Sequence, residues 1–145
     1  MARIKINLPA TFPFQCKIPV RITDVNYGGH VGNDAILSII HEARMQFLQQ
    51  AGYSETQFDT TGLIMADVAI EFKSELFYPE IIIASVAVHE VTNIGFEVVY
   101  LLEKEEDGKL VTVARAKTRM ICYDYQGKKI VAVPEGSLLK LGLAV

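Results

Sequence analysis

The first third of the chain changes its hydrophobic period once. Between positions 14 and 23 apolar and polar residues alternate strictly, which predicts a β-strand that ends at a glycine-containing turn. Pro19 falls on the opposite face and indicates that this strand lies at the edge of its sheet. The apolar face of the predicted strand consists of Phe14, Cys16, Ile18, Val20 and Ile22.

From position 34 to about 51 the apolar residues recur at helical spacing, which predicts one long helix ended by Gly52. Asn33 is the predicted N-cap. Asp34 follows it in the first turn, where a carboxylate stabilises the helix dipole. The apolar stripe of this helix consists of Ile36, Ile40, Ala43 and Phe47, widened by Ile39 and Leu48.

The remaining sequence is rich in Val, Ile, Phe and Tyr and predicts four strands, at 63–72, 80–91, 95–104 and 110–123, with a short helix or cap at 134–141. The connections at 93–95 and 107–108 are short, so the last three strands should form an antiparallel meander. One face of the last strand is mostly small and would let the sheet lie close to the helix. We therefore expect an α+β fold in which an antiparallel sheet wraps around one long central helix. The face in question consists of Ala114, Ala116, Thr118, Met120 and Cys122.

Length, charge and cysteine content restrict the number of domains, the kinds of partner and the compartment that the protein can have. At 145 residues, half of them hydrophobic, the chain is long enough for one domain over residues 1–145. A net charge of −3 argues against a nucleic-acid partner, and the lack of a signal peptide or a membrane-length apolar segment predicts a cytoplasmic protein that does not engage membranes. Cys16 and Cys122 lie in apolar runs without metal-ligand spacing, which favours free thiols. We expect neither a metal nor another cofactor.

The turn before the predicted helix carries most of the reactive side chains. Within positions 24–34 the sequence places Asp24, Asn26, His30 and Asp34 around several glycines. Glycine lets the backbone adopt positive φ and approach a ligand closely, and the first turn of a helix offers unpaired N–H groups. A polarised carbonyl group could bind at such a helix entrance.

This turn and the order of predicted elements resemble the hotdog-fold acyl-CoA thioesterases, in particular the 4-hydroxybenzoyl-CoA thioesterase-like group. The resemblance rests on Asp24-x-Asn26-x-x-Gly29-His30-Val31-Gly32-Asn33, followed by a helix containing Glu42-Ala43-Arg44. It implies a single hotdog domain that hydrolyses an acyl-CoA or related acyl thioester. A homodimer or homotetramer is also expected, with the site at the subunit interface, because a lone curled sheet leaves an open edge and an apolar rim.

The resemblance departs from the family pattern at one important position. Members commonly carry Asp-x-Asp-x-x-Gly-His-Val-Asn-Asn, so Asn26 stands where many have their catalytic aspartate. Thioester hydrolysis needs a carboxylate that attacks the carbonyl or deprotonates water, and donors for the oxyanion. Asp34 is therefore the predicted carboxylate, while Asn26 and His30 position the carbonyl or the water. The predicted substrate contacts are Asn33 and Gly29, with Arg115, Lys117 and Arg119 as candidates for the phosphates of coenzyme A.

Structural roles compete with each of these assignments. Helix stabilisation accounts for Asp34, a turn hydrogen bond or an interface contact for His30, and a solvated outer sheet face for the three cations. For Glu42 and Arg44 a structural ion pair or an interface contact is favoured over a catalytic role. Further carboxylates to consider are Asp24, Glu42 and Asp67, of which Asp67 should point outward, and His41 and His89 are expected at the surface.

Two other functions stay open. Hotdog-fold enoyl-CoA hydratases carry Asp-x-Asn-Pro-x-His, and the segment 24–30 keeps these residue types but has one extra residue and no proline. A noncatalytic acyl-binding or assembly module is the third reading, favoured by Asn26 in place of the aspartate. Assays of thioester hydrolysis and of enoyl-CoA hydration separate the three.

Overall fold

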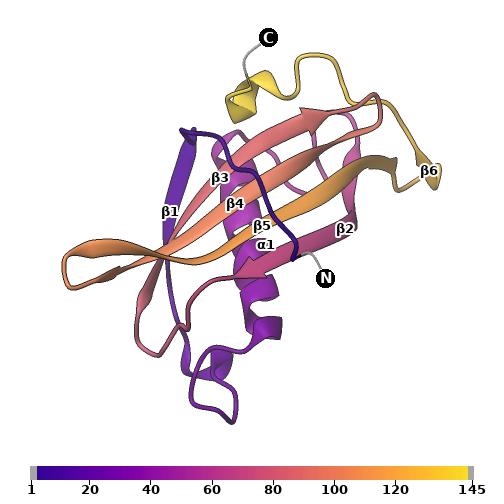
Figure 1. Cartoon of the computed structure of the whole chain (residues 1–145). Helices are drawn as coiled ribbons and strands as arrows, with labels where there is room; N and C mark the ends of the chain where they lie inside the picture. The colour runs from indigo at the N-terminus through magenta and orange to yellow at the C-terminus, as the bar shows by residue number, and fades with distance from the viewer. Residues whose placement is uncertain (1–2, 144–145) are drawn as a thin grey trace.

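One antiparallel sheet curves around the long helix α1 in the computed structural model (Figure 1). Its five long strands run in the order β1-β3-β4-β5-β2, and a short sixth strand pairs with β5. The structure describes residues 3–143, so the two outermost positions at each end of the predicted domain lie outside the described residues. The elements are β1 (Phe14–Pro19), the 3-10 turn η1 (Ile22–Asp24), α1 (Asn33–Gln50), β2 (Gly62–Phe72), β3 (Ile81–Val91), β4 (Gly95–Glu106), β5 (Lys109–Asp124), β6 (Lys129–Ile130) and the 3-10 turn η2 (Leu139–Leu141).

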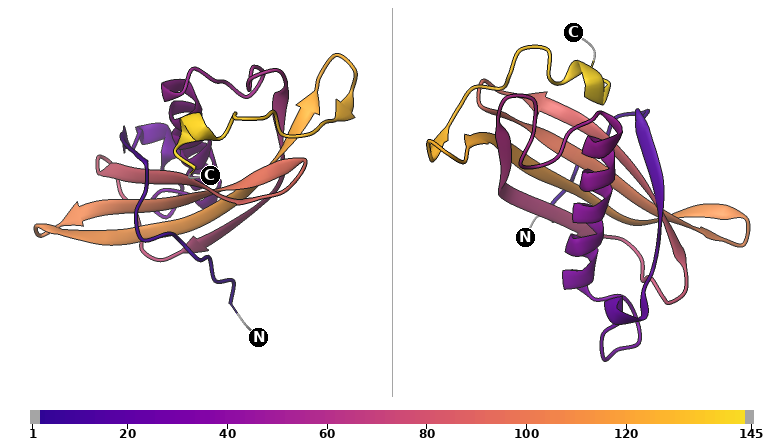
Figure 2. Two further views of the ribbon diagram at one scale, coloured as in Figure 1. Left: turned by 90° about the horizontal axis from the view of Figure 1, so that it is seen from above. Right: turned by 180° about the vertical axis from the view of Figure 1, so that it is seen from behind.

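The expected packing of sheet against helix is confirmed. The small face of β5 is fully buried: Ala114, Ala116 and Thr118 are 0% exposed, and the two alanines belong to the core cluster that α1 joins. From the other side, α1 buries Ile36, Ile40 and the rest of its predicted apolar stripe in the same cluster. Seen from behind, the helix lies in the concave side of the sheet (Figure 2).

The last three long strands form the predicted meander. Asp107 and Gly108 both adopt positive φ, 52° and 76°, in the tight turn between β4 and β5. This geometry matches the right-handed twist of a two-residue hairpin. At the edge of the sheet, β1 pairs only with β3, as Pro19 indicated.

Two local expectations at the helix entrance are wrong. β1 ends at Pro19 rather than at position 23. Ile22, expected on the apolar face of the strand, is 66% exposed, because the chain leaves the strand and forms η1, where Arg21 pairs with Asp24. Asn33 is not the N-cap either. Gly32 takes that place with extended φ and ψ of −72° and 156°, and its carbonyl accepts the first helical bond from Ile36 N at 3.1 Å.

The two chain ends cover different parts of the sheet. The N-terminal segment 3–13 crosses the face of the sheet opposite α1 and buries Ile6 there (Figures 1 and 2). At the other end, η2 provides the short helix expected within 134–141, and Leu141 joins the main core cluster. None of the helices in the described part of the chain is long and apolar enough to cross a membrane.

Candidate active site

The turn between η1 and α1 is closed by bonds within itself. Asn26 N donates to His30 O at 2.9 Å, and Gly29 N donates to Asn26 O at 3.1 Å. The Asn26 side chain also accepts from Gly28 N at 2.9 Å, which is an Asx turn. Gly29 has a φ of +84°, a conformation that side-chain-bearing residues rarely adopt. The bonding therefore fixes where the Asn26 amide points.

Asn26, His30 and Asp34 converge around two glycines of this turn. A Cβ placed on Gly28 would stand 3.3 Å from Asn26 Oδ1 and 3.4 Å from His30 Nε2. A Cβ placed on Gly32 would stand 2.5 Å from Asp34 Oδ1 and 3.7 Å from Asn26 Nδ2. The absence of side chains at both glycines thus leaves room for three polar groups, with the Asn26 amide in the middle.

The orientation of His30 follows from its own hydrogen bond. His30 Nδ1 lies 3.1 Å from Val31 O, and a carbonyl oxygen can only accept, so Nδ1 carries the proton. In the neutral ring Nε2 is then an acceptor, and Nε2 is the nitrogen that faces Gly28 and Asn26. This geometry suits a ring that orients water or takes up a proton.

The helix entrance supplies hydrogen-bond donors next to this cluster. Because the first helical bond runs from Ile36 N to Gly32 O, the N–H groups of Asn33, Asp34 and Ala35 have no acceptor within α1. These groups also carry the partial positive charge of the helix N-terminus. A developing oxyanion beside the Asp34 carboxylate would therefore meet donors that are already in place.

Asp24 has a structural role. Its buried carboxylate accepts from Arg21 N at 2.8 Å and pairs with the Arg21 guanidinium at 3.1 Å, while its carbonyl accepts from Gly32 N. These bonds join the start of the turn to its end. These contacts give Asp24 a role in forming the turn.

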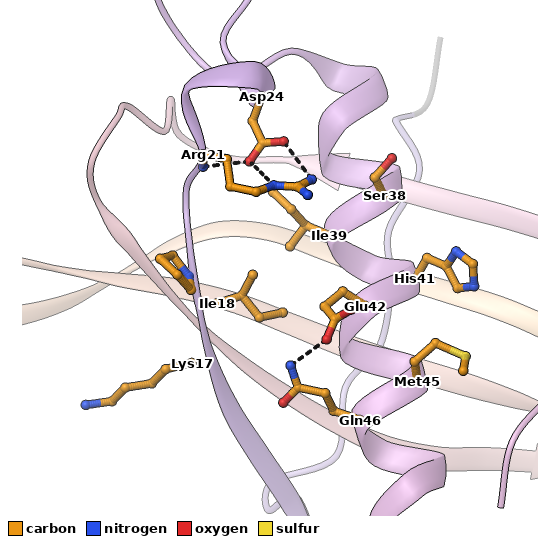
Figure 3. A pocket seen from close by; sticks show the side chains of 11 residues that line it. Lys17, Ile18, Arg21, Asp24, Ser38, Ile39, His41, Glu42, Met45 and Gln46 are labelled. Carbon is orange, nitrogen blue, oxygen red and sulfur yellow. Dashed lines mark hydrogen bonds and ion pairs between the residues drawn. The ribbon is translucent and has the colours of Figure 1, made fainter.

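A groove of about 410 Å³ runs between β1 and α1, beginning at the Arg21–Asp24 pair (Figure 3). Ile18 and Ile39 form part of its lining, and Glu42 lies beside them, bonded to Gln46 Nε2 at 2.7 Å. Asn26, His30 and Asp34 do not line this groove. They lie on the solvent side of the turn, whose tip carries the fully exposed Tyr27.

The three candidate cations, Arg115, Lys117 and Arg119, lie on the sheet face opposite α1. Within one protomer they are therefore remote from the turn that carries Asn26 and His30. Glu97 forms ion pairs with Arg119 at 3.4 Å and with Lys117 at 3.7 Å. Arg115 borders a cavity beneath the N-terminal segment. Asp67 is exposed, as expected, and follows a register irregularity in β2.

A second group on this face has the composition of a metal site. Among the described residues, His89, Glu90 and Glu97 are the group whose ligand atoms lie within 4.8 Å of one another. Glu97 is, however, already engaged by two cations, so ion pairing accounts for its position. We assign no metal to this group.

A polar network under the helix was not foreseen. Arg44 is buried and donates to Glu55 Oε1 at 2.9 Å and to Tyr100 Oη at 3.2 Å, and Tyr100 Oη lies 2.7 Å from Thr118 Oγ1. Burial raises the pKa of Tyr100. Burial alone would lower the pKa of Arg44, but Tyr100 and Glu55 raise it overall. The structural ion pair expected for Arg44 is thus present, with Glu55 instead of Glu42 as its partner.

The fold has many relatives among solved structures. A protein of the thioesterase superfamily from Jannaschia sp. CCS1 is 18% identical, with a TM-score of 0.78 over 94% of this chain and 88% of that one. A 1,4-dihydroxy-2-naphthoyl-CoA thioesterase from Synechocystis is 19% identical, with a TM-score of 0.77 over 89% and 95%. A mutant 4-hydroxybenzoyl-CoA thioesterase in complex with 4-hydroxybenzoyl-CoA is 14% identical, with a TM-score of 0.80 over 88% and 97%. The comparison with curated proteins finds no match.

These likenesses define the fold as the α+β hotdog fold. The sequence itself matches the thioesterase-like superfamily over residues 20–141, which includes the turn, α1 and every strand except β1. The chain therefore belongs to the thioesterase-like superfamily. This membership supports thioester hydrolysis as its chemistry.

Proposed function

We propose that the protein hydrolyses an acyl-CoA or related acyl thioester to the free acid and the thiol. The observation that carries the proposal is the convergence of Asn26, His30 and Asp34 beside the free N–H groups of α1. Each part of a thioester hydrolase is represented: a carboxylate, an orienting amide and imidazole, and donors for an oxyanion. Family membership makes this chemistry the first to test.

In the proposed reaction Asp34 either attacks the thioester carbon or removes a proton from the attacking water. Negative charge then develops on the carbonyl oxygen, and the N–H groups at the helix entrance stabilise it. The Asn26 amide and His30 Nε2 hold the water or the carbonyl in line with the carboxylate. Collapse of the intermediate breaks the carbon–sulfur bond, and the leaving thiolate takes up a proton from the acid formed at the site or from solvent. If water attacked, the free acid forms in the same step; if Asp34 attacked, water then hydrolyses the resulting acyl anhydride and regenerates the carboxylate.

The proposed substrate contacts lie in two different places, beside the turn and on the opposite face of the sheet. Gly29 and Asn33 flank the cluster. The Asn33 N–H has no acceptor within α1 and can donate to a thioester, whereas the Gly29 N–H is bonded to Asn26 O, so Gly29 would contact the substrate through its small, exposed backbone. Arg115, Lys117 and Arg119 lie on the other sheet face, so their proposed contact with coenzyme A phosphates is to a substrate held by a neighbouring protomer. Neutralising Lys117 and Arg119 together should raise KM for an acyl-CoA and leave kcat nearly unchanged.

A second copy of the chain has an apolar surface to cover at β2. Met65, Val68 and Phe72 lie on the α1 side of this edge strand, yet they are 42%, 37% and 45% exposed, because the helix does not reach over the edge. The outer backbone groups of β2 have no strand partner among the described residues. Pairing of two β2 edges would satisfy those groups and bury the apolar strip, so we propose a homodimer or a higher homo-oligomer.

We also propose that residues 1–145 act as one domain in the cytoplasm. The single core cluster, which joins α1 to every long strand, supports one domain. The two cysteines, Cys16 and Cys122, are both free thiols, in agreement with a reducing compartment.

The direct test is a thiol-release assay with short, medium, long and aromatic acyl-CoAs. We expect turnover with at least one class, and its identity defines the acyl specificity. Release from none of the panel, combined with saturable binding in calorimetry, would replace the proposal with the noncatalytic acyl-binding module. Hydration of an enoyl-CoA without thiol release would replace it with the hydratase.

A further inference from the structure

Lys104 is a buried cation near the end of β4, and only 4% of the residue is exposed. Its ammonium donates to Glu75 O at 2.7 Å and to Glu80 Oε1 at 3.2 Å, and it lies 3.5 Å from Glu106 Oε2. The same nitrogen lies 5.4 Å from the centre of the Phe77 ring. Because an ammonium has three N–H donors, these partners account for all of them.

Most of these partners belong to one loop, residues 75–80, between β2 and β3. The Glu80 carboxylate that meets Lys104 also accepts from Phe77 N at 2.8 Å, and Glu80 N donates back to Phe77 O at 2.8 Å. The loop is thus closed on itself through Glu80. Lys104 holds this closed loop against β4, because its ammonium contacts both the first residue of the loop, Glu75, and the last, Glu80.

The loop in turn holds both ends of the segment that carries the candidate site. Val20 N, just before η1, donates to Glu80 O at 2.9 Å, and Val31 N, just before α1, donates to Leu76 O at 2.8 Å. Val20, Val31 and Leu76 are all buried, so these bonds are shielded from water. Asn26 and His30 lie between the two attachment points, and Asp34 follows the second.

We propose that Lys104 is a positioning residue for the site and sets the geometry of the turn through the 75–80 loop. The inference rests on the proposed thioesterase function for its effect on turnover. Removing the ammonium leaves the Glu75 carbonyl and the partly buried Glu80 carboxylate without their shared donor. The loop then loosens, and the acceptors of Val20 and Val31 shift with it. A displacement of about 1 Å among reacting groups is enough to lower a rate by about a hundredfold.

Lys104→Met tests this inference because methionine keeps much of the side-chain volume and removes the charge. Glu106→Gln is the matched control, since Glu106 contacts the same ammonium from outside the loop and is more than half exposed. Two quantities are measured on each protein: amide hydrogen exchange, residue by residue, and the kinetic constants for the best acyl-CoA of the panel. In Lys104→Met we expect exchange at Val20 and Val31 to accelerate by about tenfold or more relative to the amides of central β4, and kcat to fall by about tenfold or more with KM within about threefold. In Glu106→Gln both should stay near wild type.

The inference is overturned if, in Lys104→Met, the exchange rate of the Val31 amide relative to the amides of central β4 is the same as in the wild-type protein. It is also overturned if the wild-type enzyme is active and Lys104→Met has the same kcat. If Lys104→Met does not fold, Glu80→Gln takes its place, because glutamine can still accept from Phe77 N but carries no charge for Lys104; the same outcomes support or overturn the inference. A wild-type protein that hydrolyses no member of the panel contradicts the proposed function alone. The exchange rates then still decide whether Lys104 fixes the turn.

Discussion

Gly32 lies directly against the carboxylate of Asp34: a Cβ on Gly32 would stand 2.5 Å from Asp34 Oδ1. The backbone of Gly32, with φ of −72° and ψ of 156°, lies in a region open to any residue. Glycine is thus required here by the neighbouring carboxylate and not by the backbone. The exposed Asp34 side chain can move aside, so the conflict affects its position more than the fold.

Gly32→Ala should therefore lower turnover by about tenfold or more, because it displaces Asp34, and change the free energy of unfolding by only about 1 kcal/mol or less. Thiol release and urea unfolding measure the two effects. Gly127→Ala is the control, since a Cβ there would stand 2.7 Å from Asp124 Oδ2, a similar conflict in the turn before β6. Equal losses of turnover in the two variants would show that the position of Asp34 is not what matters.

The hydrophobic pattern was sufficient to predict the main elements but not the details of the helix entrance. Period-two and helical spacing identified the long helix and all five long strands, because an element that is buried on one face carries apolar residues at its own structural period. Ile22 was misplaced since the ion pair of Arg21 with Asp24 overrides the alternation. Asn33 was misplaced as the cap because the sequence does not reveal which residue accepts the first helical bond.

The long-range polar contacts were beyond the sequence for a different reason. Arg44 meets Glu55 and Tyr100, and Lys104 meets Glu75 and Glu80, across separations of 11 to 56 residues. One hint was available: Arg44 follows Ile40 by four positions and precedes Phe47 by three, which places it on the buried stripe. A charge at such a position predicts a buried partner without identifying it.

Val68→Lys should break the proposed subunit contact, because it places a charge in the apolar strip of the β2 edge. We expect light scattering to report a monomer at micromolar concentration, with thiol release reduced by about tenfold or more if the site needs the second copy. Val91→Lys is the control, since Val91 is similarly exposed at the end of β3. A wild-type protein that is already monomeric would contradict the oligomer directly.

The stability of the protein should fall between about pH 9 and pH 11. Burial raises the pKa of Cys122 from 9.0 to about 11, and burial with a smaller effect of Glu42 does the same for Cys16. In this window the thiols ionise in the unfolded chain but not in the folded one, so the free energy of unfolding decreases as pH rises. Urea unfolding at several pH values should show a smaller decrease for Cys122→Ala than for wild type. Parallel curves for the two proteins would contradict this effect of burial.

Asn26→Asp tests whether the chemistry depends on the position that carries the catalytic aspartate in many family members. Because Asn26 Nδ2 faces the Gly32 side of the turn near Asp34, a second carboxylate there would repel the first. We expect no large gain in kcat from this change, measured with the best acyl-CoA of the panel. A gain in kcat of about tenfold or more would show that the site works better with a carboxylate at position 26 and that Asp34 is not the catalytic carboxylate.

The most direct test of the account is kcat for thioester hydrolysis in Asp34→Asn. Asparagine has almost the same size and Asp34 makes no capping bond, so the variant should stay folded and lose about 1 kcal/mol or less of stability through the helix dipole. If Asp34 is the nucleophile or base, kcat falls by about a hundredfold or more. A folded Asp34→Asn protein with wild-type turnover would contradict the central claim and direct attention to Asp24, Glu42 and Asp67.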